Sequence, residues 1–504
     1  MSVIRIKSID GQEIAFEDKV IGQGGMKDVY FSPDKSYVVA FFRDKQDANA
    51  RERLSSIVSV YRERLYNQAG GEYWKKLFCW PTHIVEHEGK LGVVAPTYAS
   101  HFFFQHGSTE NDKLSLKGKE KEGKWFASAR HQIQYLDPRE RGNWMSYFRI
   151  CILISRAIRR MHAAGLAHSD LSYKNILVDP AGGNACIIDI DGLVVSGKFP
   201  PGVVGTPDFI APEVMQTRDL SSSDKNKKLP CKETDQHALA VLIYMYLLYR
   251  HPLKGRKVHD LDDTDRDEFL AMGEKALFIE DPSDHSNRYD WKWVERNEEN
   301  NAKYYAPWMN LDIIPYTVLG PYLSPLVKQA FVTGLHSPHQ RPSADDWETA
   351  LVKTVDLMQP CQNKSCSQQW YVFDNTTKPR CPFCGTPFNG QLPILNFYSR
   401  KKDSYNPDNY RLMVYHNQYL YPWHVNRNVF PNERLNDSQK KPVGYFSFHQ
   451  GNWCFVNQTL SAMNDLTEKK DIPINSMVML KEGKQLLLSP EEGGRLVYIQ
   501  LLNA

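Results

Sequence analysis

Short runs of β-branched and aromatic residues, separated by polar turns, fill the first hundred positions. Runs at 29–31, 37–42 and 91–94 are flanked by turn residues and predict strands. Between them, residues 51–66 carry apolar side chains at helical spacing and predict one helix. Residues 1–98 are therefore expected to form a strand-rich lobe.

Helical spacing dominates from about residue 140. The clearest helices are predicted at 144–164 and 233–249, whereas the polar, Asp-rich segment 253–319 shows no clear pattern. Short strand-like runs between polar turns return in residues 390–504. The chain therefore belongs to the α+β class, with a strand-rich part, a larger helical part and a β-rich end.

Length and composition limit the possible classes of protein. The 504 residues are too many for one core, so about two to four domains are expected. Hydrophobic residues make up 41% of the chain, which is typical of a globular protein rather than a disordered one. The net charge of +3 does not favour nucleic acid or an anionic membrane as the main partner. The mixed-charge run 117–124 is expected to be a solvated loop.

Cysteine usage favours a cytoplasmic setting. Four of the nine cysteines are grouped, and the others are scattered: Cys79, Cys151, Cys186, Cys231 and Cys454. This usage predicts buried thiols in a reducing compartment rather than a disulfide framework. Residues 1–19 lack the apolar stretch of a signal peptide. The longest apolar run, 238–249, is too short to span a bilayer.

A glycine-rich segment at 21–30 lies between two predicted strands and reads Ile-Gly-Gln-Gly-Gly-Met-Lys-Asp-Val-Tyr. Glycines let backbone N–H groups approach phosphate oxygens, although a hairpin turn is an equally common use. Four motifs follow in order: His-Ser-Asp-Leu-Ser-Tyr-Lys-Asn at 168–175, Ile-Asp-Ile-Asp-Gly at 188–192, Gly-Thr-Pro-Asp-Phe-Ile-Ala-Pro-Glu at 205–213, and Arg-Pro-Ser-Ala at 341–344. Their joint order and spacing resemble the protein-kinase signature set over residues 15–358.

The resemblance implies a two-lobed kinase fold and a role for several single residues. Asp170 matches the catalytic base, which accepts or orients the substrate hydroxyl proton. Asn175 and Asp189 match the ligands of Mg²⁺, an ion that prefers hard oxygen donors. Glu213 and Arg341 match an ion pair that braces the substrate-side loop. In that loop, the Gly-Thr-Pro stretch with Thr206 is similar to the serine/threonine version.

The strand expected to carry the phosphate-binding lysine departs from this pattern. Residues 39–42 read Val-Ala-Phe-Phe and offer no lysine, so one interpretation is an inactive kinase. Lys27, however, replaces the third glycine of the loop, as in the with-no-lysine kinases, and is expected to reach the same phosphates. The alternative for Lys27 is a solvated turn residue, and Arg43 and Lys45 are weaker substitutes.

Further positions also differ from the kinase pattern. Glu63 is the helix residue expected to face the phosphate lysine, although a surface role is almost as reasonable. Ser169 replaces the arginine that receives an activation-loop phosphate, so activation by that route is not expected. Because Ser172 replaces a catalytic-loop lysine, Lys174 is expected to supply the catalytic cation. Asp191 replaces the glycine of Asp-Phe-Gly, and both metal binding and loop capping stay open for it.

The nucleotide site that the resemblance implies spans both lobes. Residues 92–98 lie where kinases hinge and bind adenine, through backbone groups from Pro96 to Tyr98. Proline has no N–H, so its carbonyl is the one main-chain contact it offers. The expected nucleotide contacts are Gly22, Gly24, Gly25, Lys27, Val29, Ala40, Glu63, Pro96, Tyr98, Asn175 and Asp189.

Two cysteine pairs follow the kinase-like region, Cys361-x₄-Cys366 and Cys381-x₂-Cys384. Four thiolates on two tight turns suit a tetrahedral Zn²⁺, and residues 359–389 resemble a zinc ribbon. A closed Cys₄ site leaves no open coordination position, so a structural role is expected, with the metal supplying folding energy. Disulfides or a redox pair are the alternatives.

Residues 390–504 faintly resemble the second half of a forkhead-associated β-sandwich. The phosphothreonine-reading motifs of that family are not evident, so a plain interaction or packing sandwich is favoured over phosphopeptide binding.

The expected architecture has a kinase N-lobe at 1–98, a C-lobe at 99–358, the ribbon and the sandwich. This arrangement is similar to bacterial kinases associated with tellurite resistance and stress. Those kinases imply a von Willebrand factor A-like partner and a metal-dependent phosphatase. We expect a cytoplasmic serine/threonine kinase that uses ATP and Mg²⁺ on a protein substrate, with no nucleic acid or membrane partner. The alternative is a nucleotide-binding pseudokinase scaffold that recruits partners through the ribbon and the β domain.

Overall fold

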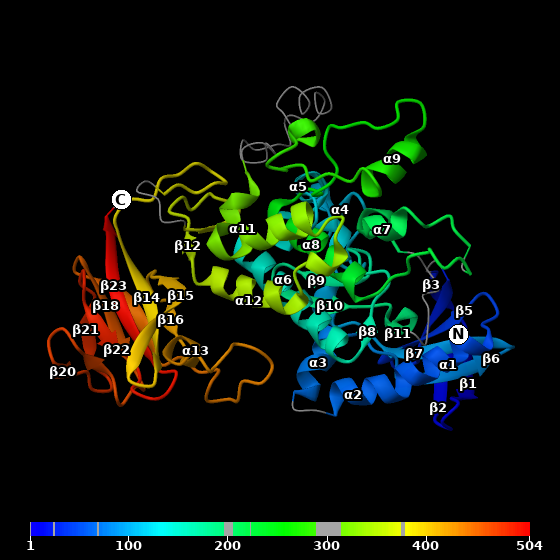
Figure 1. The fold of residues 1–504 in the computed structure, drawn as a ribbon. Coiled ribbons are helices and arrows are strands. Elements are labelled where there is room, and N and C mark those ends of the chain that lie inside the picture. The colour runs from blue at the N-terminus through cyan, green and yellow to red at the C-terminus, as the bar shows by residue number, and fades with distance from the viewer. Residues whose placement is uncertain are drawn as a thin grey trace. The chain divides into compact units, whose positions relative to one another are not determined.

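The computed structural model describes residues 2–23, 26–67, 70–195, 205–221, 223–288, 314–373 and 379–503 (Figure 1). The chain divides into two compact units. The first takes in residues 1–142, 146–305 and 326–348, and the second takes in residues 143–145, 306–325 and 349–504. The second unit thus includes segments predicted to belong to the C-lobe, and the division into N-lobe, C-lobe, ribbon and sandwich stays a proposal.

Five antiparallel strands form the sheet of the first lobe, in the order β3-β4-β5-β7-β6. They are β3 (Val20–Gln23), β4 (Lys27–Phe31), β5 (Tyr37–Phe42), β6 (His83–His87) and β7 (Lys90–Pro96). The predicted strands are confirmed. A further hairpin, β1 (Val3–Lys7) and β2 (Glu13–Glu17), packs Ile14 and Phe16 against Val39 and Phe41.

The helix predicted at 51–66 is present and slightly longer. It runs as α1 (Ala48–Ser56), a π-helical turn η1 (Ile57–Tyr61) and α2 (Arg62–Tyr66), and α3 (Gly71–Leu77) follows. The carboxylate of Asp47 caps its first turn by accepting a backbone N–H. Leu54 is buried in one cluster with Ala40 and Phe42 of β5. Apolar contacts therefore hold this helix to the sheet.

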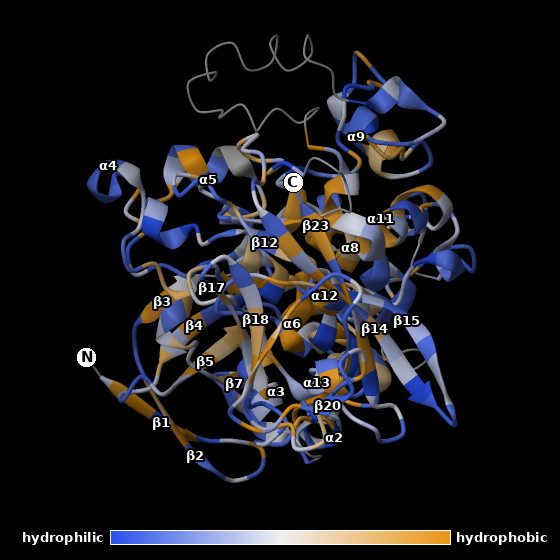
Figure 2. Cartoon of the chain, turned by 90° about the vertical axis from the view of Figure 1, so that its left-hand side faces the viewer, coloured by the Kyte–Doolittle hydropathy of each residue, from blue (hydrophilic) through white to orange (hydrophobic). Residues whose placement is uncertain are grey.

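Helices α6 (Trp144–Ala163) and α8 (Lys232–Leu248) form the centre of the helical lobe and match the predicted segments within one residue. Nearly all of α8 is buried, which explains its long apolar run. Figure 2 shows the hydrophobic residues along α6 and α8, whereas α4 is hydrophilic. The remaining helices are α4 (Thr109–Asp112), α5 (Ala129–Tyr135), α7 (Pro212–Met215), α9 (Thr264–Met272), α11 (Gly320–Lys328) and α12 (Ala344–Val355).

Four short strands complete the first unit and frame its loops: β8 (Leu166–Ala167), β9 (Ile176–Asp179), β10 (Asn184–Ile187) and β11 (Val194–Val195). β9 pairs with β10, and β8 pairs with β11, both antiparallel. The two pairs hold the loops that carry residues 168–175 and 188–193. Two of the motifs singled out in the sequence, at 168–175 and 188–192, therefore lie between short strands in one lobe.

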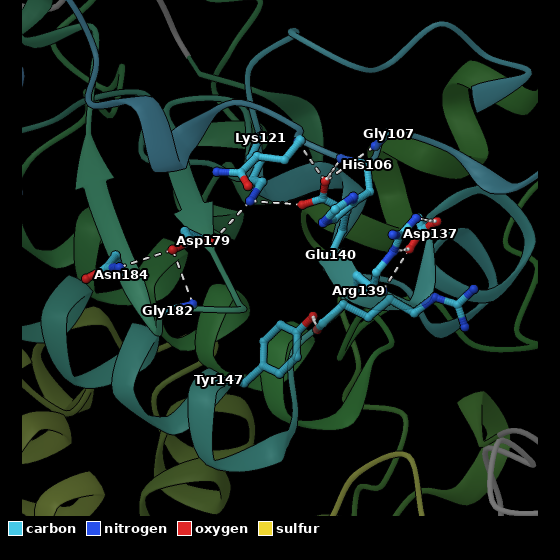
Figure 3. Close-up of polar contacts among 12 residues, drawn as sticks. His106, Gly107, Lys121, Asp137, Arg139, Glu140, Tyr147, Asp179, Gly182 and Asn184 are labelled. Carbon is cyan, nitrogen blue, oxygen red and sulfur yellow. Dashed lines mark hydrogen bonds and ion pairs between the residues drawn. The ribbon is translucent and has the colours of Figure 1, made fainter. Parts of the chain in front are cut away.

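The mixed-charge run 117–124 is not simply a solvated loop. Its Lys121 is only 3% exposed, with its ammonium 2.9 Å from Glu140 and 3.1 Å from Asp179 at the end of β9 (Figure 3). Glu140 Oε1 also accepts the backbone N–H groups of Gln105, His106 and Gly107. The expectation was wrong for Lys121, because charge pattern alone does not show which lysine pairs across the fold.

In the second unit, two antiparallel sheets share one hydrophobic core, as a β-sandwich requires. The larger sheet contains β15 (Ser404–Met413), β14 (Gln391–Lys401), β23 (Arg495–Asn503), β22 (Gln485–Leu487), β19 (Asn464–Asp465) and β20 (Lys470–Asp471). The smaller contains β16 (Tyr419–Leu420), β17 (Gly444–His449), β18 (Asn452–Asn457) and β21 (Met477–Met479). Outside the sheets lie β12 (Met358–Pro360), β13 (Trp370–Val372) and α13 (Pro422–Val425).

Across the described ranges, no helix combines the length and the apolar character that a membrane span needs.

Candidate active site

Lys27 opens strand β4 and lies directly opposite Phe42 in the antiparallel pairing with β5. Phe42 occupies the position where the kinase pattern has its lysine. Directly opposed residues of an antiparallel pair project to the same face, with Cβ atoms about 5 Å apart. A lysine at position 27 therefore reaches the space that a lysine at position 42 would reach. The Lys27 ammonium lies 5.3 Å from the centroid of the Phe42 ring.

The ammonium of Lys27 is held by two aspartates, and we call these three residues the Lys27 cluster. Nζ lies 3.0 Å from Asp189 Oδ1, and 2.8 and 2.7 Å from the two carboxylate oxygens of Asp191. The Asp191 side chain is 9% exposed, whereas that of Asp189 is 49% exposed. The ammonium thus connects the β lobe to the segment that carries the expected metal ligand.

Charge and burial act in opposite directions in this cluster. Burial works to lower the pKa of Lys27, but the negative charges of Asp191 and Asp189 outweigh it and raise that pKa above its ordinary value. Burial likewise works to raise the pKa of Asp189, and the charge of Lys27 overcomes it and leaves that pKa below its ordinary value. Lys27 and Asp189 are therefore both charged at neutral pH.

Asp170 lies in the loop between β8 and β9, and two neighbours fix its carboxylate. Asn175 Nδ2 donates to the Asp170 carbonyl oxygen at 2.8 Å and to its Oδ2 at 2.9 Å. Thr206 donates to Asp170 Oδ1 from its backbone nitrogen at 2.7 Å and from its hydroxyl at 2.9 Å. Donors on both oxygens hold the carboxylate in one orientation, as a positioned base needs.

The loops around Asp170 are tied to the helical core. The backbone nitrogen of His168 donates to Asp235 of α8 at 2.7 Å, and His168 Nε2 lies 3.0 Å from the Ile188 carbonyl oxygen. Ser169 and Asp189 have left-handed φ values of 67° and 58°. Non-glycine residues in this region store strain and concentrate at functional sites. The loop and the Asp189 segment are therefore held in place by their surroundings.

The segment that brings Thr206 to Asp170 needs a glycine before it. Gly205 has a φ of +115°, and an added Cβ would lie 3.3 Å from both the Ile210 side chain and the Ser169 carbonyl oxygen. A residue with a Cβ at position 205 would be strained by this φ and would crowd the Ile210 side chain and the Ser169 carbonyl oxygen.

The ion pair expected between Glu213 and Arg341 is present. Arg341 Nη1 and Nη2 lie 2.8 and 2.7 Å from the two Glu213 oxygens in a bidentate arrangement. The Arg341 side chain is buried and also donates to the carbonyl oxygens of Glu233, Gly334 and Leu335. This pair fixes the start of α7, next to the Thr206 segment.

Several expected nucleotide contacts lie on or near the glycine-rich hairpin. Gly24 and Gly25 lie outside the described residues. Gly22 of β3 pairs with Val29 of β4, and Val29 pairs in turn with Ala40 of β5. Val29 packs against the cluster that contains Ala40. Both side chains therefore lie on the sheet face that Lys27 shares.

Other expected residues are not brought to the Lys27 cluster. Glu63 is exposed on α2, and Asp189 and Asp191, rather than Glu63, bind the Lys27 ammonium. Lys174 is exposed, and within the described ranges its side chain forms no ion pair with Asp170. Arg43 is 41% exposed and lies 3.9 Å from Asp28. The sequence left the role of Asp191 open, and the structure brings it to Lys27. Its position two residues after Asp189 was the sequence signal that could have predicted this contact.

Pro96 and Tyr98 border a cavity of about 380 Å³ together with residues of α3, α6 and β10. The Pro96 carbonyl oxygen accepts a hydrogen bond from the Cys79 thiol at 3.4 Å. Tyr98 packs against the buried pair Phe102 and Leu177. Lys27, Asn175 and Asp189 are not among the described residues that line this cavity. The adenine contact of Pro96 and Tyr98 therefore stays a proposal.

In the second unit, the four sulfurs of the two cysteine pairs lie within 4.8 Å of one another: Cys361, Cys366, Cys381 and Cys384. Two of the Sγ–Sγ separations are 3.5 and 3.9 Å. A tetrahedral zinc with Zn–S bonds near 2.3 Å needs sulfurs about 3.8 Å apart. The thiol set thus has the number, chemistry and spacing that a structural zinc requires.

Comparison with known proteins concerns the part of the chain that carries Asp170 and Asp189. Residues 132–346 match the sequence model of the family described as "Protein kinase domain". A protein named "Death-associated protein kinase related" from Drosophila melanogaster is 30% identical over 132 residues, covering 25% of this chain and 17% of the relative. Serine/threonine-protein kinase PknD from Chlamydia abortus is 31% identical over 142 residues, covering 23% and 14%. Residues 132–346 therefore match a protein kinase domain, and serine/threonine kinases are among the relatives.

The aligned segments span less than a fifth of the length of these two relatives. Among solved structures, the kinase domain of a Toxoplasma gondii rhoptry antigen aligns at 14% identity with a TM-score of 0.37, covering 70% of this chain and 86% of that one.

Proposed function

We propose that the chain is a serine/threonine protein kinase that transfers the γ-phosphate of ATP to protein hydroxyl groups in the presence of Mg²⁺. The observation that carries the proposal is the 3.0 Å contact between Lys27 of the β lobe and Asp189 of the helical lobe. It supports the hypothesis of a relocated lysine, because Lys27 lies beside the expected metal ligand. Asp170 and Asn175 are hydrogen-bonded to each other in the adjoining loop.

The residues divide the chemistry of phosphoryl transfer among them. Asp189 and Asn175 offer the hard oxygen donors that would hold Mg²⁺, which when bound neutralises phosphate charge. Lys27 supplies a cation to the phosphates from the adjacent strand. Asp170 orients the substrate hydroxyl and takes its proton, as the hydroxyl oxygen bonds to the γ-phosphorus and the bond from that phosphorus to the ADP oxygen breaks. Lys174, exposed and four residues after Asp170, supplies the second cation of the catalytic loop in this proposal.

The decisive experiment is transfer of label from γ-³²P-ATP to a generic protein substrate by the full chain, with an Asp170→Ala variant as control. The proposal predicts Mg²⁺-dependent transfer that falls about 100-fold or more in the variant. ATP binding without transfer by the wild-type chain would leave the pseudokinase scaffold as the function. Equal transfer by the variant would show that Asp170 is not the base.

The four-cysteine cluster is proposed to hold a structural Zn²⁺ in a ribbon over residues 359–389. Four convergent thiols without an open side fit a closed site rather than a catalytic one. Metal analysis of purified chain should find one zinc per molecule, and a Cys366→Ser/Cys381→Ser variant should lose it. Protein without zinc, or a Cys361–Cys384 disulfide that persists in protein purified under reducing conditions, would contradict this proposal.

For the rest of the second unit we propose an interaction domain in a cytoplasmic protein. The shared core of its two sheets supports a sandwich, as the forkhead-associated resemblance implies. The von Willebrand factor A-like partner and the metal-dependent phosphatase rest on resemblance to the tellurite-associated kinases. Mixing purified 390–504 with such a partner and following co-elution tests this part; separate elution of both would contradict it.

A further inference from the structure

Asp191 contacts the ammonium of Lys27, a role that its place in the sequence left open. In the kinase pattern, a glutamate on the N-lobe helix holds the phosphate lysine in place. Here Glu63, the expected helix residue, is exposed, and Lys27 is bound by Asp189 and Asp191. The counter-ion of the lysine therefore comes from the helical lobe.

The two aspartates differ in a way that separates their roles. Asp191 contacts Lys27 with both carboxylate oxygens and its side chain is 9% exposed. Asp189 contacts Lys27 with one oxygen and is 49% exposed. An arriving nucleotide with its metal can reach the half-exposed Asp189 more readily than the largely buried Asp191. Asp191 is therefore the partner that can keep Lys27 while Asp189 exchanges its own.

The N-lobe helix is held to the sheet by a different kind of contact. Phe42, which replaces the usual lysine, is buried with Leu54 of α1, and Val58 packs against the same cluster. An apolar junction of this kind needs no glutamate facing the sheet. The replacement of lysine by phenylalanine at position 42 and the move of the counter-ion to Asp191 thus form one consistent change.

We infer that Asp191 is the positioning residue for Lys27 and takes the role that the helix glutamate has in other kinases. The inference rests on the proposed function and adds to it a second residue of the phosphate grip. With Asp191 in this role, the position of Lys27 no longer depends on the N-lobe helix. Lys27 and the metal ligand Asp189 are both positioned by one segment of two neighbouring aspartates, so movement of α1–α2 does not release the lysine.

The test compares Asp191→Asn, Asp191→Glu and Glu63→Gln in the full chain. Loss of a charged hydrogen-bond partner should weaken ATP binding and lower kcat/KM by about tenfold to 100-fold in Asp191→Asn. Asp191→Glu keeps the charge and should recover part of the loss. Glu63→Gln should stay within about twofold of wild type, because Glu63 does not touch Lys27. A large loss in Glu63→Gln, with Asp191→Asn unaffected, overturns the inference.

A double-mutant cycle distinguishes positioning of Lys27 from general support of the fold. In a Lys27→Met background, Asp191→Asn should weaken ATP binding less than about twofold further, because its target is gone. An equal loss in both backgrounds shows a structural role and overturns the inference. ATP affinity is measured by calorimetry, separately from transfer. A wild-type chain that binds ATP but transfers no phosphate would contradict the proposed kinase activity, while the binding cycle would still decide the role of Asp191.

Discussion

Two clusters in the first unit contain the same groups, one lysine and two carboxylates, but one is closed to solvent and the other is open to it. In the Lys121 cluster (Lys121, Glu140 and Asp179), all three side chains are at most 7% exposed. In the Lys27 cluster, exposure rises from 9% at Asp191 to 17% at Lys27 and 49% at Asp189. One cluster is sealed and the other opens toward solvent.

The partners of the carboxylates explain the difference. In the Lys121 cluster, Glu140 accepts three backbone N–H groups, and Asp179 accepts a backbone N–H from Gly182 and the side chain of Asn184 (Figure 3). These donors leave little capacity for another ligand, so the cluster fastens residues 105–107 and 140 to β9. In the Lys27 cluster the lysine is the main partner of both aspartates. A fully satisfied buried cluster is structural, whereas an open one can exchange partners.

Removal of Lys121 should have the largest effect on stability. Lys121→Met leaves Glu140 and Asp179 as uncompensated buried charges and should lower the free energy of unfolding by about 3–5 kcal/mol. Lys124→Met is the matched control, because Lys124 is 41% exposed, and it should cost less than about 1 kcal/mol. Urea unfolding of the full chain measures both. Equal stability of the two variants would contradict the structural role of the Lys121 cluster.

The pairing of Lys27 with Phe42 allows a rescue experiment. Because residues 27 and 42 are opposed on one sheet face, a lysine restored at position 42 should reach the same phosphates. The Lys27→Met/Phe42→Lys variant should recover about tenfold in kcat/KM over Lys27→Met alone. Phe41→Lys in the same background is the control, because position 41 faces the other side of the sheet. Recovery in the control would refute the geometric argument.

The smallest expected effect is the pH dependence of the contact between Lys27 and Asp189. The folded-state pKa of Asp189 is lowered, so its contribution to stability is present above the unfolded pKa of about 3.9 and is lost as pH falls further. Because Asp189 is half-exposed, we expect a difference of at most about 1 kcal/mol between wild type and Asp189→Asn at pH 7. Urea titrations should show this difference shrinking below about pH 4. A difference that grows on acidification would reverse the assigned sign.

The sequence predicted those parts of the site in which local chemistry and chain order are enough. Asp170 and Asn175 lie five residues apart in one loop, and the structure joins them by hydrogen bonds. Phe42 stands where the kinase pattern has a lysine, and Lys27 replaces the third glycine of the loop; this resemblance to the with-no-lysine kinases pointed to Lys27. The helices at 144–164 and 233–249 followed from long apolar patterns that tertiary packing reinforces.

Contacts between distant segments were beyond such reasoning. Glu63 was expected to face the phosphate lysine, with a surface role as the alternative; it is exposed on α2, and Asp191 contacts Lys27 instead. Lys121 is one of several lysines in a mixed-charge run, and nothing local distinguishes it from its exposed neighbours. In both cases, the partner is chosen by three-dimensional packing of segments far apart in the chain.

The account depends most on the claim that Lys27 serves the nucleotide rather than the fold. One comparison tests it: γ-phosphate transfer and urea unfolding measured on the same preparations of wild type, Lys27→Met and Arg43→Met. We predict that Lys27→Met lowers transfer by about 100-fold or more while its unfolding free energy changes far less than that of Lys121→Met, and that Arg43→Met transfers normally. Full transfer by Lys27→Met, or a loss of stability equal to that of Lys121→Met, would contradict the claim.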